Sequence, residues 1–228
     1  SFADATGGLT ITDAGGLATI GAVGSGTAGN VTITNSQAGV TFSSTVDAGT
    51  LSITDTADNQ DVTFAGDVNA VTLTTTANAY DLIFQEDVTV TNDVTFAAIR
   101  NLDIGDGPDV ATFNGGLDTQ AATGTVTLAG TIQTSGDRMD IGAVTLAADT
   151  TLDTGNAAAG ILNVGAVTSG TNALTLDSGS TGGATIGLTS FADATGGLTI
   201  TDAGGLATIG AVGSGTAGNV TITNSQAG

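Results

Sequence analysis

The chain has 228 residues; 40% are hydrophobic, but aromatic residues make up only 4% and charged residues 11%. The net charge of −20 comes almost entirely from Asp, which disfavours nucleic acid and anionic lipid as partners and favours divalent cations. The sequence contains no Cys, His or Lys, which excludes disulfides, imidazole metal sites and most nucleophile–base pairs. We therefore expect no enzymatic activity.

Short alternating strands are predicted along the first half of the chain, at intervals of about 20 residues. One set begins at Leu9, Val31, Leu51 and Val71. A second set covers residues 40–42, 62–64 and 82–84, and the apolar residues Val46, Val68 and Val88 follow it. One coil of the chain would then carry three short strand segments.

Alternation along these strands assigns side chains to two faces. The apolar residues expected to point inward are Leu9, Ile11, Val31, Ile33, Leu51, Ile53, Val71 and Leu73. The hydroxyl residues expected to point outward are Thr10, Thr12, Thr32, Thr34, Ser52, Thr54, Thr72 and Thr74. Phe42, Phe64 and Phe84 would form an internal aromatic ladder, continued by Phe96 and Phe113.

The strand spacing varies from about residue 94 to residue 174, which loops of variable length explain. Asn often precedes a strand, where it tolerates left-handed backbone geometry and bonds between coils. Such residues are Asn30, Asn69, Asn101, Asn172 and Asn219. Strong helix formers other than Ala and Leu are nearly absent, and no apolar run is long enough to span a membrane as a helix. These features predict an all-β parallel β-solenoid with about 20 residues per coil and no helices.

A long repeat is superimposed on this short period. Residues 1–39 recur without change as residues 190–228. Residues 1–189 therefore form one tandem unit, and residues 190–228 begin the next identical unit without a true domain boundary. Such repetition indicates a fibre-forming protein whose units associate with one another, end to end and laterally.

The segments VTITNSQAGVTF (31–42) and LSITDTADNQDVTF (51–64) carry a resemblance to a known group of proteins. Their pattern resembles the β-helical repeats of large bacterial surface proteins, namely filamentous-haemagglutinin-type adhesins and autotransporter passengers. The resemblance covers essentially the whole chain. It implies a right-handed solenoid, secretion to the cell surface, and a role in adhesion or in building a sheath.

Asp103, Asp106 and Asp109 are the candidate metal ligands. They lie in one loop with Gly105 and Gly107, which permit the sharp turn that calcium loops use. An ordinary acidic turn around the single proline is the alternative interpretation. No other cofactor is expected.

The function predicted from these features is that of a structural repeat in an extracellular filament, stalk or sheath. Adhesion to a glycan or protein at a cell surface is the alternative. The outward Thr-x-Thr pairs, among them Thr89 and Thr91, leave ice binding as a third interpretation, although Thr is also an ordinary solvent-facing strand residue.

Overall fold

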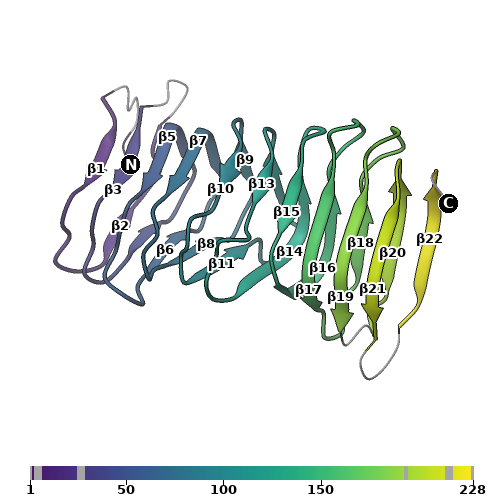
Figure 1. Ribbon diagram of the computed structural model, residues 1–228. Helices are drawn as coiled ribbons and strands as arrows, with labels where there is room; N and C mark the ends of the chain where they lie inside the picture. The colour runs from purple at the N-terminus through teal and green to yellow at the C-terminus, as the bar shows by residue number, and fades with distance from the viewer. Residues whose placement is uncertain (1, 3–6, 25–28, 193–194, 214–217, 227–228) are drawn as a thin grey trace.

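Parallel strands stacked in successive coils make up the whole described fold (Figure 1). The computed structural model describes residues 2, 7–24, 29–192, 195–213 and 218–226, and no helix occurs among them. The strands are β1 (Leu9–Ile11), β2 (Ala18–Ile20), β3 (Val31–Ile33), β4 (Val40–Phe42), β5 (Val46–Ile53), β6 (Asp61–Phe64), β7 (Val68–Thr75), β8 (Asp81–Phe84), β9 (Val88–Val90), β10 (Val94–Thr95), β11 (Asn101–Ile104), β12 (Val110–Phe113), β13 (Leu117–Asp118), β14 (Val126–Gln133), β15 (Met139–Ile141), β16 (Val144–Asp153), β17 (Leu162–Thr168), β18 (Leu174–Asp177), β19 (Ile186–Ala192), β20 (Leu198–Ala203), β21 (Ala207–Val212) and β22 (Val220–Ser225). The predicted parallel β-solenoid is confirmed.

Three ladders of paired strands run along the stack, and each coil contributes one segment to each ladder. Ladder 1 passes through the paired residues Leu9, Val31, Leu51 and Leu73. Where β10 contacts β7, it continues through the paired residues Val94, Leu117, Met139, Leu162, Ile186 and Ala207. Ladder 2 passes through Ala18, Val40, Val62, Leu82, Leu102, Val126, Val144, Val167, Phe191 and Val212. Ladder 3 passes through Phe2, Val23, Val46, Val68, Val88, Ala111, Ile132, Leu152, Leu176, Ile200 and Ile222.

Coil length varies along the chain, and most coils are slightly longer than predicted. Leu9, for example, pairs with Val31. The step from Leu102 to Val126 takes more of the chain than the next step, from Val126 to Val144. The turns absorb most of these differences, and β16 absorbs some itself, since its register with β14 shifts between Leu128 and Gly130. Variable turns therefore explain the uneven spacing in the middle of the sequence.

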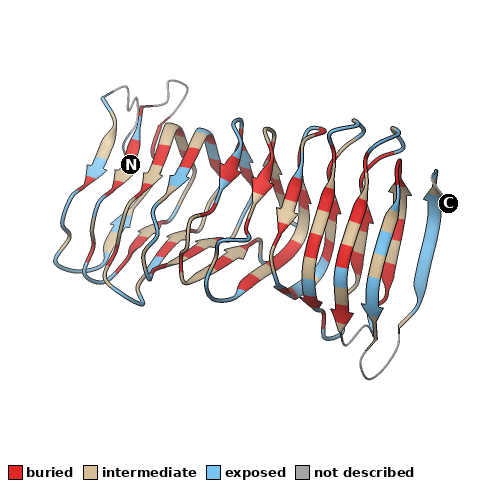
Figure 2. Ribbon diagram, viewed as in Figure 1, coloured by how far each residue is buried: buried red, intermediate tan, exposed pale blue. Residues whose placement is uncertain are grey.

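The core fills the interior of the solenoid, and buried residues recur along the strands of successive coils (Figure 2). Phe64 lies between Phe42 and Phe84, with ring centroids 4.9 and 5.2 Å apart and rings nearly parallel. Phe96 contacts Phe84 at 6.5 Å with a tilted ring, and Phe113 meets Phe96 edge-on at 6.2 Å. The predicted aromatic ladder is confirmed, although its last two rings lie on other ladders and do not stack face to face.

Val71 does not point inward as predicted. Leu73, two residues later, pairs with Leu51, and the Val71 side chain is half exposed. β7 carries Ala70 on ladder 3 and Leu73 on ladder 1, so two residues are needed to turn the corner between them. Val71 occupies this corner, and its outward position follows from that.

Buried hydroxyl groups hold the turns that leave ladder 3. Thr134 donates to the carbonyl of Asp137 at 2.7 Å, and Thr154 donates to that of Gly160, also at 2.7 Å. Ser178 makes the equivalent bond to Ala184 at 3.2 Å. Each buried hydroxyl thus finds its hydrogen-bond acceptor in the turn that follows it.

The two identical segments occupy different ladders. Leu9 lies on ladder 1, whereas its twin Leu198 pairs with Leu174 on ladder 3. Pairing within each copy is nevertheless the same, since Leu198 pairs with Val220 as Leu9 pairs with Val31. The second copy is therefore displaced by one ladder relative to the first.

Candidate functional site

The predicted calcium ligands lie on a strand and in the turn that follows it. Asp103 is on β11, where Thr127 of the next coil bonds its carboxylate; burial, with smaller contributions from neighbouring carboxylates, raises its pKa. In the turn, the backbone N–H groups of Asp106 and Gly107 donate to Asp109 Oδ2 at 3.0 and 3.1 Å. Asp109 therefore closes the turn by accepting N–H groups from residues that precede it. Among the described residues, no three acidic side chains are arranged to hold a metal ion.

Tyr80, the single tyrosine of the chain, is inaccessible to a sugar ligand. Its ring is fully buried, and its hydroxyl donates to the carbonyl of Ile53 at 3.3 Å. Burial raises the pKa of Tyr80 to about 12, because the phenolate would lose its hydration. This side chain contributes to the core and not to a binding surface.

The two arginines are each paired with an aspartate. Arg100 Nη2 lies 2.5 Å from Asp81 Oδ2 on the preceding coil. Arg138 Nε lies 2.5 Å from Asp140 Oδ2, and this hydrogen bond raises the pKa of Arg138 above its ordinary value. Neither cation is thus available as a lone positive group for an anionic substrate.

An acidic row follows the outer face of ladder 3. Asp153 pairs with Asp177, and Asp202 accepts the Ser178 N–H through its backbone carbonyl, which brings the three aspartates side by side on successive coils. Burial raises the pKa of Asp177, and repulsion from Asp153 and Asp202 adds to the effect. Asn224 continues the row by donating to Asp202 Oδ1 at 2.6 Å.

The acidic row was not predicted from the sequence, although the sequence contains a signal for it. The tetrapeptides LDTG (152–155) and LDSG (176–179) occupy equivalent positions in adjacent coils. Asp153 and Asp177 each accept a hydrogen bond from the glycine two residues later, at 2.7 and 2.8 Å. A search for tetrapeptides recurring at the coil period would have identified the pair.

Asparagines connect the coils through their side chains. Asn69 donates to Asp47 at 2.9 Å, and Asn30 and Asn101 accept backbone N–H groups of the next coil at 3.1 and 2.9 Å. Asn172 donates to the carbonyl of Leu146 at 2.8 Å. Bonding between coils is thus confirmed for these residues. The expected left-handed geometry is wrong for them, since Asn59 is the one non-glycine residue with positive φ among those described.

Outward threonines form rows, but their composition differs from the predicted pairs. In the first half, Thr10, Thr32, Ser52 and Thr74 align on ladder 1. A second row on ladder 3 consists of Thr131, Thr151, Thr175, Thr199 and Thr221. Thr89 pairs with Asn69 on ladder 3, so it does not extend the first row. The longest threonine row thus lies in the second half of the chain.

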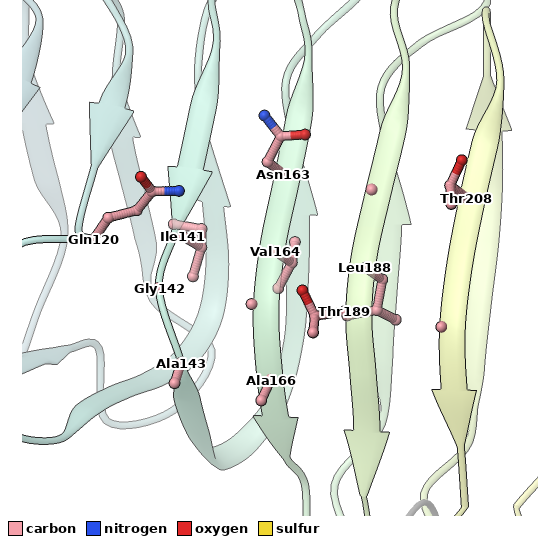
Figure 3. Close-up of a pocket in the computed structure, with 13 residues that line it drawn as sticks. Gln120, Ile141, Gly142, Ala143, Asn163, Val164, Ala166, Leu188, Thr189 and Thr208 are labelled. Atoms are coloured by element: carbon pink, nitrogen blue, oxygen red, sulfur yellow. The ribbon is translucent and has the colours of Figure 1, made fainter.

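A shallow groove of about 690 Å³ crosses β15, β17, β19 and β21 (Figure 3). Its floor is formed by small residues, including Gly142 and Gly165, and its polar side chains include Asn163 and Thr208. The Asn163 amide already donates to Asp140 Oδ1 at 2.8 Å. The groove is lined by no charged side chain and no aromatic ring, so it offers neither an ionised group nor a stacking surface for a sugar.

Within the part of the chain that the structure describes, no helix is long and apolar enough to cross a membrane. Comparison of the sequence with models of protein families and with curated proteins, and of the fold with solved structures, gave no match.

Proposed function

We propose that this chain is a structural repeat of an extracellular filament, stalk or sheath in which coils of β-solenoid stack without interruption. The observation that carries the proposal is the continuity of the stack across the junction between units. The strands of the second copy, β20, β21 and β22, pair in parallel with β18, β19 and β20, so the repeated segment extends the ladders without a break. A repeat whose second copy continues the same stack is suited to a continuous rod.

The surface of the solenoid supports the same proposal. Asp residues dominate its charge, and both arginines are neutralised by neighbouring aspartates. Each coil buries its inner face only by stacking on its neighbours, so each added unit further stabilises the array. The predicted calcium ions and the lateral contacts between fibres remain predictions.

The proposal is tested with arrays that contain one, two or three 189-residue units, each followed by residues 190–228. Because stacked strands rise ~4.8 Å per coil, each added unit is expected to lengthen the rod by ~42 Å at constant width in cryo-electron microscopy. Globular beads on flexible linkers would contradict a filament. Surface labelling of intact cells with an antibody against residues 40–189 tests the extracellular location, and labelling that requires permeabilised cells would contradict it.

A second candidate, ice binding, is favoured by the threonine row on ladder 3. Five threonines in register on successive coils repeat at the coil spacing of ~4.8 Å. Thermal hysteresis of the 228-residue chain measures this activity, and Thr175→Asp should abolish it. Absence of hysteresis in the unsubstituted chain would exclude this candidate and leave the filament unaffected.

A further inference from the structure

Identical residues in two environments show which surface fits β22. The side chains of Val220 and Ile222 are 51% and 56% exposed, whereas their twins Val31 and Ile33 are fully buried. The second half of β5 covers the twins, in strict parallel register. The same sequence in the same strand conformation is complementary to the same partner. A coil with the sequence of β5 is therefore the natural neighbour of β22.

The ladders on which equivalent residues of the two copies lie show how far the second copy is rotated about the solenoid axis relative to the first. Leu9 lies on ladder 1, and Leu198 lies on ladder 3 after eight full coils and two further ladders. Phe2 and Phe191 show the same displacement, from ladder 3 to ladder 2. Since the 189-residue unit is not a whole number of coils, every further identical unit repeats this displacement.

We propose that units of this sequence stack with a turn of one ladder per unit, that is, a rotation about the solenoid axis from one ladder to another, so that the second unit continues on β22 with its own copy of β5 and the surface of the array repeats every three units. This inference rests on the proposed filament. Three units contain about 26 coils and span ~125 Å at ~4.8 Å per coil. A partner that recognises one side of the array would therefore meet the same residues once in three units.

The turn also determines which surface rows cross a junction. Thr199, the twin of Thr10, pairs with Thr175 and so extends the threonine row of ladder 3. Asp202, the twin of Asp13, lies next to Asp177 and extends the acidic row. Without the displacement, the second copy would continue ladder 1 and neither row would be extended. Each junction thus builds one threonine row and one acidic row, on a ladder different from that of the previous junction.

Thiol counting tests the proposal, because the natural chain has no Cys. Thr10→Cys, Thr175→Cys and Thr199→Cys are introduced together into the 228-residue chain. Neighbouring coils place paired Cα atoms ~4.8 Å apart, within the range that a disulfide bridges. Mild oxidation is expected to link the cysteines at 175 and 199 and to leave the cysteine at 10 free, as peptide mass spectrometry would show.

A three-unit array extends the test to every junction. Cysteine is placed at the Thr10 and Thr175 positions of each unit and at the Thr199 position that follows the last unit. Each cysteine at a Thr175 position should form a disulfide with the cysteine at the start of the following unit, and only the first cysteine of the array should stay free. The matched control pairs Gly187→Cys with Thr199→Cys, because a stack without the turn would place Thr199 beside Gly187 on ladder 1. A disulfide in the control, or free thiols at the junctions, would overturn the proposal.

Cryo-electron microscopy of the unsubstituted array gives an independent readout. A repeat of ~125 Å supports the turn, whereas a repeat of ~42 Å contradicts it. Arrays that fail to form rods would contradict the filament itself, while rods with unturned junctions would contradict only the present inference. The two failures are therefore distinguishable.

Discussion

Replacing Phe64 by alanine tests the physical basis of the stack. The Phe64 side chain is fully buried, and its ring stacks on Phe42 and Phe84 at 4.9 and 5.2 Å. Loss of a buried phenylalanine costs about 3–5 kcal/mol, of which each ring pair accounts for about 0.5–1.5 kcal/mol. Phe64→Leu retains most of the apolar volume and loses both ring pairs, so a loss of about 1–3 kcal/mol is expected for it.

Urea unfolding followed by circular dichroism measures both losses. Hydrogen exchange then locates the damage, which should be confined to the coils that carry Phe42, Phe64 and Phe84, because coils interact mainly with their neighbours. Val71→Ala is the control, since a half-exposed side chain should change stability by less than about 0.5 kcal/mol. A loss below about 1 kcal/mol for Phe64→Ala would refute the assigned inward face.

Three further predictions concern single residues. Gly179→Ala should cost about 2 kcal/mol or more in urea unfolding, because φ is +74° and the new Cβ would overlap the carbonyl oxygen of Gly155. Gly107→Ala is its control and should be nearly neutral, since nothing lies within 4 Å of that Cβ. Asp177→Asn should raise the urea midpoint at pH 7, because the folded-state pKa of Asp177 is raised and its charge therefore destabilises the fold. The gain should shrink as the pH falls through the raised folded-state pKa of Asp177, because the natural carboxyl then takes up a proton and loses its charge; an undiminished gain would contradict the assigned cause. Absorbance at 295 nm should show Tyr80 ionising with a midpoint of about 12 in the folded chain and near 10 in urea, and a folded-state midpoint near 10 would show that the ring is exposed.

The fold was accessible from the sequence because alternation and a short period survive in most coils. Leu9, Val31 and Leu51 all pair as predicted. Prediction failed at Val71 because Val71 and Leu73 satisfy the same alternation, and only the corner geometry after Ala70 decides between them. A pattern of period two cannot reveal where a strand bends.

The surface rows were less accessible than the core. Asp153, Asp177 and Asp202 become neighbours only through pairings that each span a whole coil, in a region where coil length varies. The candidate ligands Asp103, Asp106 and Asp109 are close in sequence, but Asp103 lies on a strand and Asp109 closes its own turn. Their convergence on a metal ion stays a prediction, whereas strand register places Asp153, Asp177 and Asp202 in a row that proximity in sequence does not suggest.

The exact recurrence of residues 1–39 as residues 190–228 has a genetic consequence. Recombination between the two coding stretches for residues 1–39 and 190–228 would insert or remove one whole unit. Because these stretches encode the same residues and pair in the same way in both copies, the strands at the point of exchange would keep their sequences and their partners. Rod length would then be a heritable quantity that changes in steps of ~42 Å, with no new packing problem at any step.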